Sequence, residues 1–149
     1  MHAPRLNAYT AAPAAMKALQ NVEAYLHQSG LDKRLIELVK MRASQINGCA
    51  YCLAMHSKEL RRLGETEQRI YLLNAWEESP LYTPRERAAL AWTEALTRIA
   101  DTHAPDAAYD EVRAQFDDKE LVDLTTLIGM INVWNRLAIS LRYQHPVEA

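Results

Sequence analysis

The sequence predicts an all-α protein, and three observations support this class. Alanine and leucine are plentiful, whereas the 149 residues include only four glycines and six prolines, a composition that favours helix over sheet. Apolar residues recur every three or four positions through several long segments. Residues that typically start or end helices stand at the ends of those segments. Since no repeat, low-complexity tract or Gly/Ser linker interrupts the chain, we expect six or seven helices in one domain spanning residues 1–149.

The first two predicted helices lie in the N-terminal third of the chain. Residues 11–30 carry an apolar stripe at helical spacing, and Gly30 ends it. Residues 32–47 follow, with Asp32 placed to cap the first turn. Asn47-Gly48 then breaks the pattern, because both residue types tolerate positive φ. We therefore expect a tight turn at this point.

Three further helices are predicted in the middle and one at the end of the chain. Residues 49–63 form the third helix, with Gly64 as its stop, and residues 66–79 form the fourth. Residues 83–103 form the fifth, because Thr83-Pro84 is a favoured helix start. After a short segment at 106–116, residues 117–144 form the longest helix.

The last predicted helix is apolar on more than one side, which indicates burial on more than one side. A neighbouring subunit could supply part of that burial, so we expect the protein to oligomerise through its helices.

Charge and targeting signals narrow the class of function. The net charge of −2, without a clustered basic surplus, argues against nucleic acids and anionic membrane surfaces as partners. No apolar run approaches the roughly 18 residues that a membrane span needs, and the N-terminus lacks the apolar core of a secretory signal. We therefore expect a cytoplasmic protein. In that reducing compartment, a close cysteine pair is more often catalytic or metal-binding than structural.

The two cysteines of the chain stand three residues apart, in the stretch NGCAYCLAMHSKEL. Positions i and i+3 on a helix are about 5–6 Å apart, within the range that a disulfide requires. Cys49 and Cys52 can therefore open and close a disulfide with little backbone movement. His56 lies four residues after Cys52, so all three side chains share one helical face.

The residues alone leave the roles of the two sulfurs open. Cys49 stands at the helix start, where free amide groups and the helix dipole stabilise an anion and can lower the pKa of a thiol below about 8.5. His56, with an ordinary pKa near ~6.5, is better placed to accept the proton of Cys52 or to donate one to a leaving group.

The residue types in this cluster also fit two other interpretations. In one, both cysteines are small buried hydrophobic residues and His56 is an ordinary surface residue. In the other, Cys49, Cys52, His56 and a carboxylate bind zinc. Three ligands along one helix face converge poorly on a tetrahedral centre, and no second cysteine pair exists. We expect no metal and no cofactor.

The motif E-x11-C-x2-C-x3-H, formed here by Glu37, Cys49, Cys52 and His56, resembles the AhpD-like alkylhydroperoxidase branch of the carboxymuconolactone decarboxylase superfamily. The stretch IELVKMRASQINGCAYCLAMHSKELRRLG carries the motif, and the resemblance extends over roughly residues 13–143. Without that resemblance, Glu37 could simply form an ion pair with Lys33 or Lys40, which stand at helical spacing from it.

The resemblance implies an all-α homo-oligomer, a trimer or a hexamer, with thiol peroxidase or disulfide reductase activity. Cys52 is then the sulfur that attacks a hydroperoxide, and Cys49 resolves the sulfenic acid as a disulfide. Glu37 and His56 form a proton relay. The implied partners are a hydroperoxide substrate and a thiol reductant, lipoamide-like or thioredoxin-like.

One residue departs from the family pattern. AhpD proteins carry a second histidine between the cysteines, where this chain has Tyr51, a poorer proton shuttle at neutral pH. A dithiol oxidoreductase acting on lipoamide-like or protein disulfides is therefore the second hypothesis. The third is a non-catalytic helical oligomer.

Asn132, Trp134 and Arg136 interrupt the apolar last helix, and we expect a structural role for them.

Overall fold

The computed structural model describes residues 2–147, and within that range the chain forms nine α-helices, one 3-10 helix and no strand. The all-α class is therefore confirmed. The elements are α1 (Ala8–Ala11), α2 (Pro13–His27), α3 (Lys33–Asn47), α4 (Ala50–Arg62), α5 (Glu67–Tyr71), η1 (Leu73–Ala75), α6 (Pro84–Thr97), α7 (Ile99–Thr102), α8 (Asp106–Arg113) and α9 (Asp118–Leu141). This set exceeds the expected six or seven helices because several are separate short pieces.

The single helix predicted over residues 66–79 is wrong. The chain instead forms α5, a turn of 3-10 helix and an irregular connection to α6. Ile70, Leu73 and Trp76 are all buried, and they recur every three residues rather than alternating three and four. Ile70 lies in α5, Leu73 begins the 3-10 turn and Trp76 follows it, and the tighter turn helps to bring Leu73 and Trp76, three residues apart, to one side.

The helix predicted over residues 83–103 is also interrupted. It ends at Thr97, and the separate turn α7 follows, in which Ile99 is exposed rather than facing inward. The Thr102 hydroxyl donates to the carbonyl of Ala95 at 2.6 Å, which supplies a partner for a carbonyl near the end of α6. His103, with φ of 53°, completes the change of direction.

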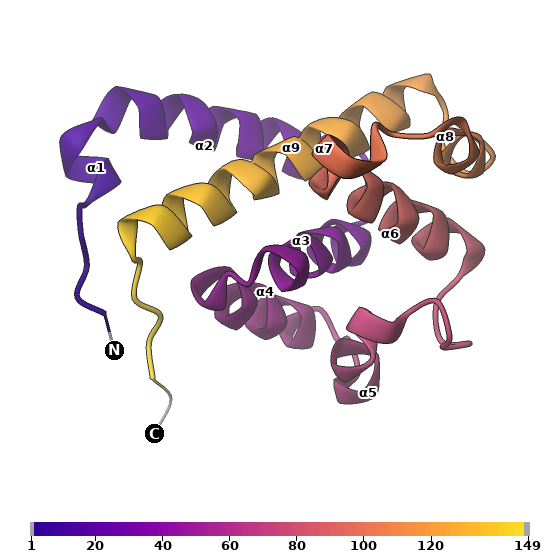
Figure 1. Ribbon diagram of the computed structural model, residues 1–149, viewed down its shortest axis with the longest axis horizontal. Coiled ribbons are helices and arrows are strands. Elements are labelled where there is room, and N and C mark those ends of the chain that lie inside the picture. Colours follow the sequence, from indigo (N-terminus) through magenta and orange to yellow (C-terminus); the bar gives the residue numbers. More distant parts are fainter. Residues whose placement is uncertain (1, 148–149) are drawn as a thin grey trace.

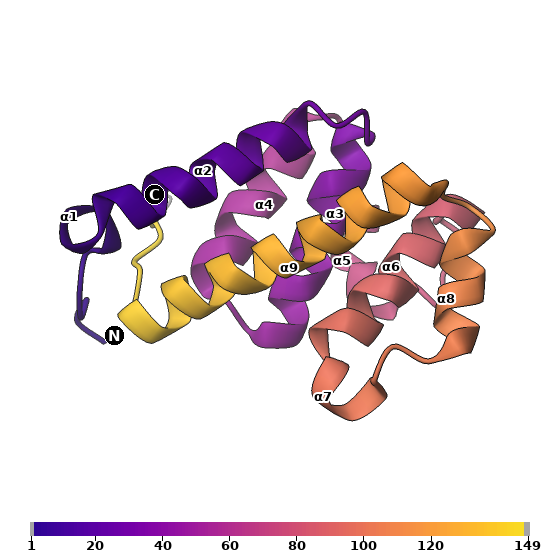
Figure 2. The same ribbon diagram turned by 90° about the horizontal axis from the view of Figure 1, so that it is seen from above.

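Helix α3 is the central element of the bundle. It packs against α4, α6 and α9, and Figures 1 and 2 show it enclosed between them. Its apolar residues divide between two core clusters, with Leu35, Ile36 and Val39 in one and Leu38 and Met41 in the other. A helix that is buried on several sides also carries its polar residues inward, and this property positions the site described below.

Helix α9 crosses the bundle and contacts α2, α3, α4, α6 and α8 (Figure 2). Its 24 residues are long and apolar enough to span a membrane by those two criteria alone. A long helix in the core of a protein meets the same criteria, and the contacts of α9 with five other helices are those of a core helix. The expected absence of a membrane partner therefore stays a prediction.

The start of α9 is set by a capping box. The Asp117 carboxylate accepts from the backbone N–H of Glu120 at 2.8 Å, and the Glu120 carboxylate accepts from the N–H of Asp117 at 3.1 Å. Each contact satisfies a backbone donor that the helix leaves without an internal partner.

We predict that Asp117→Ala lowers the free energy of unfolding by about 1 kcal/mol, because the capping acceptor is lost. Asp117→Asn, which keeps an acceptor oxygen, should stay within a few tenths of a kcal/mol of the parent protein. Urea denaturation followed by circular dichroism measures both variants. Equal losses in the two variants would show that the negative charge, and not the cap, stabilises this helix end.

Candidate active site

The turn between α3 and α4 positions the cysteine pair. Gly48 is left-handed, with φ of 69°, and its N–H donates to the carbonyl of Gln45 at 3.3 Å. The N–H of Cys49 donates to the carbonyl of Ser44 at 3.0 Å. Glycine closes a helix C-terminus in the left-handed conformation at the least cost, because it lacks a Cβ atom. The predicted Asn47-Gly48 turn is thus confirmed, with Gly48 as the residue that adopts positive φ.

Cys49 and Cys52 are joined by a disulfide, with Cα atoms 5.3 Å apart. Cys49 is the N-cap of α4 rather than a residue of its first turn, and its sulfur accepts from the N–H of Cys52 at 3.3 Å. The sulfur thus occupies the place that a serine or threonine oxygen takes in an ordinary cap. Both cysteines are almost fully buried, at 1% exposure.

Glu37 and His56 meet in the buried contact between α3 and α4. Glu37 Oε2 lies 2.7 Å from His56 Nδ1, and the two residues are 4% and 6% exposed. A carboxylate accepts hydrogen bonds, so the ring proton belongs on Nδ1, and Nε2 is the nitrogen left to exchange protons. The alternative ion pair of Glu37 with Lys40 is wrong, because Lys40 binds Glu23 instead.

A cavity of about 580 Å³ brings three of the four predicted site residues together. Glu37, Cys52 and His56 all line it. Met55, Trp134 and Ala138 contribute apolar surface to its wall. The fourth predicted residue, Cys49, is bonded to Cys52 but is not part of this lining. Concave, largely apolar surfaces with a few convergent polar groups are typical of small-molecule sites.

A buried ion pair in the same cavity wall was not predicted from the sequence. Lys40 Nζ lies 2.8 Å from Glu23 Oε2, and the indole N–H of Trp134 donates to Glu23 Oε1 at 2.8 Å. These contacts join α2, α3 and α9, and the residues are 17 and 111 positions apart in the chain. No local pattern could have indicated them.

Two tyrosines pack beside the disulfide. The rings of Tyr51 and Tyr143 meet edge to face, with centroids 5.5 Å apart, and both contact the cluster of Cys49, Cys52 and Ala138. Tyr51 therefore packs against an aromatic ring here. Sequence reasoning missed Tyr143, because it follows the end of α9 and carries no motif.

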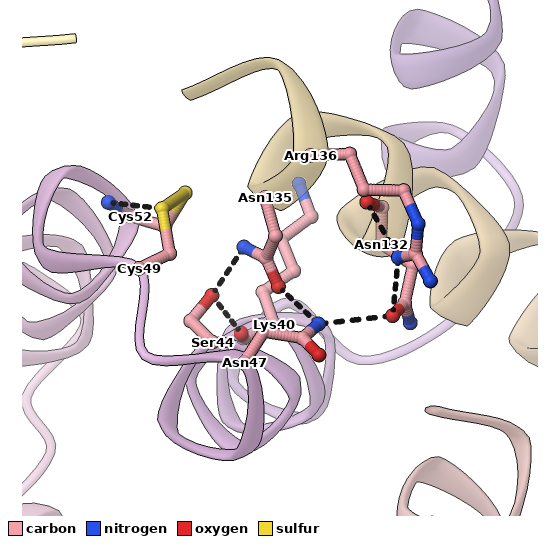
Figure 3. The surroundings of a disulfide bond; sticks show 8 residues. All are labelled: Lys40, Ser44, Asn47, Cys49, Cys52, Asn132, Asn135 and Arg136. Atoms are coloured by element: carbon pink, nitrogen blue, oxygen red, sulfur yellow. Dashed lines mark hydrogen bonds between the residues drawn. A yellow bond between two sulfur atoms is a disulfide. The ribbon is translucent and has the colours of Figure 1, made fainter. Parts of the chain in front are cut away.

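Figure 3 shows a polar network beside the disulfide, where the end of α3 meets α9. The Asn47 amide donates to Asn132 Oδ1 at 3.0 Å and to Asn135 Oδ1 at 2.9 Å, and the Asn135 amide donates to Ser44 Oγ at 3.0 Å. Asn132 thus has the structural role that the sequence predicts for it, and Asn47 shares that role. Arg136 is exposed and donates to Asn132.

The zinc hypothesis has no matching geometry in the part of the chain that the structure describes. Across residues 2–147, no three histidine, cysteine or acidic side chains converge as metal ligands.

Together these features define a class of helical protein with a buried disulfide at a helix start and a Glu–His pair in the adjoining cavity. The sequence matches the model of the carboxymuconolactone decarboxylase family over residues 11–95. The chain therefore belongs to this family.

Similar proteins agree with this assignment. The uncharacterized protein YdfG of Bacillus subtilis is 44% identical over 137 residues, which cover 92% of this chain and 93% of that protein. The crystal structure of ATU0492 from Agrobacterium tumefaciens, of unknown function and named provisionally as an antioxidant defence protein AhpD, superposes with a TM-score of 0.95. It is 52% identical, over 98% of this chain and all of that chain. A shorter match joins 41 residues to the alkyl hydroperoxide reductase AhpD of Mycobacteroides abscessus, at 44% identity over 28% of this chain and 23% of that protein.

The Glu23 pair predicts a pH-dependent stability. Burial by itself raises the pKa of Glu23, but the charge of Lys40 and the hydrogen bonds from Lys40 and Trp134 outweigh it and lower that pKa below the ordinary 4.5. A carboxyl whose pKa is lower in the folded state stabilises the fold above its unfolded-state value. That contribution is lost as the pH falls through the folded-state pKa.

We predict that Glu23→Gln lowers the free energy of unfolding by about 1–3 kcal/mol at pH 7, because Lys40 loses its charged partner. The difference from the parent protein should shrink as the pH falls below 4.5. Urea denaturation between pH 7 and pH 3 measures it, with the exposed Glu78→Gln as the matched control. A difference that stays constant over this range would exclude the ion pair as its cause.

Proposed function

We propose that the protein is a thiol-dependent peroxidase that reduces alkyl hydroperoxides through a Cys49–Cys52 dithiol/disulfide cycle. One observation carries the proposal: the cysteine pair is close enough to form a disulfide, and Cys52 lines the same cavity as the Glu37–His56 pair. Membership of the carboxymuconolactone decarboxylase family and the partial match to AhpD support it.

The proposed cycle starts from the dithiol. His56, oriented by Glu37 through Nδ1, accepts the proton of Cys52, and the Cys52 thiolate attacks the terminal oxygen of the hydroperoxide. The O–O bond breaks, and the departing alkoxide takes the proton from His56 and leaves as an alcohol. Cys52 is now a sulfenic acid.

The second step closes the disulfide. The Cys49 thiolate, stabilised at the start of α4 by the N–H of Cys52, attacks the sulfur of the sulfenic acid. Hydroxide leaves and takes up a proton to form water. Each turnover thus converts one hydroperoxide and one dithiol into an alcohol, water and a disulfide. A thiol reductant of the lipoamide or thioredoxin kind would then supply two electrons to restore the dithiol.

The cavity wall favours a substrate with an apolar body. Met55, Trp134 and Ala138 can cover an alkyl or aryl group, while the polar groups at Cys52 and His56 receive the peroxide end. We further propose that the enzyme works in the cytoplasm as a homo-oligomer, a trimer or a hexamer. The exposed apolar residue Val122 on α9 is consistent with association through helices.

We predict that replacing Cys52 and replacing Cys49 have different effects on hydroperoxide consumption. Cys52→Ser should not consume cumene hydroperoxide, because the attacking sulfur is gone. Cys49→Ser should consume about one equivalent and stop at a sulfenic acid, which dimedone traps for mass spectrometry. If the reduced parent protein keeps both thiols in the presence of peroxide, the proposal fails. Should those thiols then react only with disulfides such as lipoamide, the activity is that of a dithiol oxidoreductase.

We predict that Glu37→Gln slows single-turnover oxidation of the prereduced protein by roughly 10- to 100-fold, because the neutral amide no longer stabilises a charged His56. General acid–base catalysis as a whole contributes about 10²- to 10⁴-fold, so His56→Gln should cost at least as much. Stopped-flow tryptophan fluorescence or quenched thiol counting gives the rates. The matched control is Glu111→Gln, an exposed glutamate on α8. A rate for Glu37→Gln equal to that of this control would remove Glu37 from the relay.

A further inference from the structure

The disulfide lies between two cavities, with one sulfur-bearing residue on each. Cys52 lines the 580 Å³ cavity that also contains Glu37 and His56. Cys49 lines a second cavity of about 310 Å³, which we call the Cys49 cavity. Tyr51 and Ala138 line both cavities, so they form the wall between them.

The wall of the Cys49 cavity combines residues 48–51, at the turn into α4, with residues from the two ends of the chain. Ile139, Arg142, Tyr143 and His145 line it from the end of α9 and the segment that follows. The N-terminal segment is tied to this segment, because the Gln144 amide donates to the carbonyl of His2 at 3.2 Å. The two cavities therefore share α4 and α9 around the same disulfide, but only the Cys49 cavity is closed by the segment that follows α9.

We propose that the thiol that re-reduces the enzyme enters through the Cys49 cavity and attacks Cys49, while the hydroperoxide uses the cavity of Cys52. This inference rests on the proposed function, since it assigns the reductive half of that cycle. The reductant is a thiol that can present a thiolate in a narrow cavity, whether free or carried on a flexible arm.

The chemistry of the step balances as thiol–disulfide exchange. The incoming thiolate forms a bond to the Cys49 sulfur, the Cys49–Cys52 bond breaks, and its electron pair leaves on Cys52. Cys52 is four residues from His56 on α4 and lines the same cavity. Its thiolate therefore forms where the His56 imidazole can donate a proton to it. A second thiol of the reductant then displaces Cys49, and the reductant departs as a disulfide.

Two factors determine which sulfur the incoming thiol attacks: the access of that thiol to each sulfur, and the stability of the thiolate that departs. They favour different sulfurs. The N–H of Cys52 donates to the Cys49 sulfur, which favours Cys49 as the departing thiolate and thus attack at Cys52. Attack at Cys52, however, has to occur in the cavity that the peroxide substrate also uses. Both cysteines are 1% exposed, so the reachable cavity decides which sulfur a thiol can meet.

Polar groups of the Cys49 cavity suit an anionic nucleophile. Arg142, His2 and His145 line it, and no residue of that lining within the described chain carries a carboxylate. The Tyr143 hydroxyl is buried and has no hydrogen-bond partner among residues 2–147. Burial, with the neighbouring Tyr9 and Tyr51, raises the pKa of Tyr143, so its hydroxyl stays a donor at neutral pH.

The first experiment locates the mixed disulfide. Protein oxidised with diamide, without peroxide, is mixed with glutathione, quenched with acid after short times and alkylated with N-ethylmaleimide. Trypsin releases both cysteines on one peptide, residues 43–58, and fragmentation between them assigns each label. We expect glutathione on Cys49 and maleimide on Cys52 in at least a tenfold excess over the reverse. Glutathione on Cys52 in equal or larger amount would overturn the inference.

The second experiment blocks each cavity in turn. Ile139→Trp fills the Cys49 cavity and Met55→Trp fills the other, and both positions are 46% exposed, so neither change disturbs the core. Ile139→Trp should slow reduction of the diamide-formed disulfide by glutathione at least tenfold more than Met55→Trp does. Met55→Trp should in turn slow oxidation by cumene hydroperoxide more than Ile139→Trp does.

The reductive comparison decides the inference even if the peroxidase proposal fails, because diamide forms the disulfide without peroxide. Equal slowing of reduction by the two tryptophan variants would overturn the inference. Thermal denaturation of each variant confirms that it remains folded.

Discussion

The buried contact between Glu37 and His56 is the constraint around which the candidate site is built. Both groups are almost completely removed from water, and a buried carboxylate or imidazole without a partner is costly. Each therefore requires the other, and α3 and α4 must pack in the one register that brings them together. That register places the start of α4, with its two sulfurs, against the cavity that the pair lines.

Contacts with the rest of the bundle fix this arrangement of α3 and α4. Gly48 lets the chain turn directly from α3 into α4, and Asn47 fixes the end of α3 to two asparagines of α9. Trp134, on the same helix α9, reaches Glu23 and its partner Lys40 in the cavity wall. Because α9 supplies Asn132, Asn135 and Trp134 to these contacts and lines both cavities through Ala138, its position affects access to the disulfide from either side.

A disulfide with a cavity on each side offers a physical means to keep two reactions apart. An oxidising substrate and a reducing one that shared a single pocket would compete for it, whereas separate approaches leave each free to bind. In the proposed cycle Tyr51 would form part of the partition between the two approaches, since it packs on Tyr143 and lines both cavities.

Local sequence was sufficient for the helical class, for the caps at Asp32 and Thr83 and for the turn at Gly48, because spacing, capping chemistry and backbone freedom act within a few residues. Local spacing also indicated Cys49, Cys52 and His56 as a set, whereas Glu37 was added only by the resemblance to the family. It could not show that Lys40 binds Glu23 rather than Glu37, that Tyr143 lies beside the disulfide, or that the two cysteines line different cavities. These facts depend on contacts between segments far apart in the chain, which arise only when α2, α4 and α9 pack around α3.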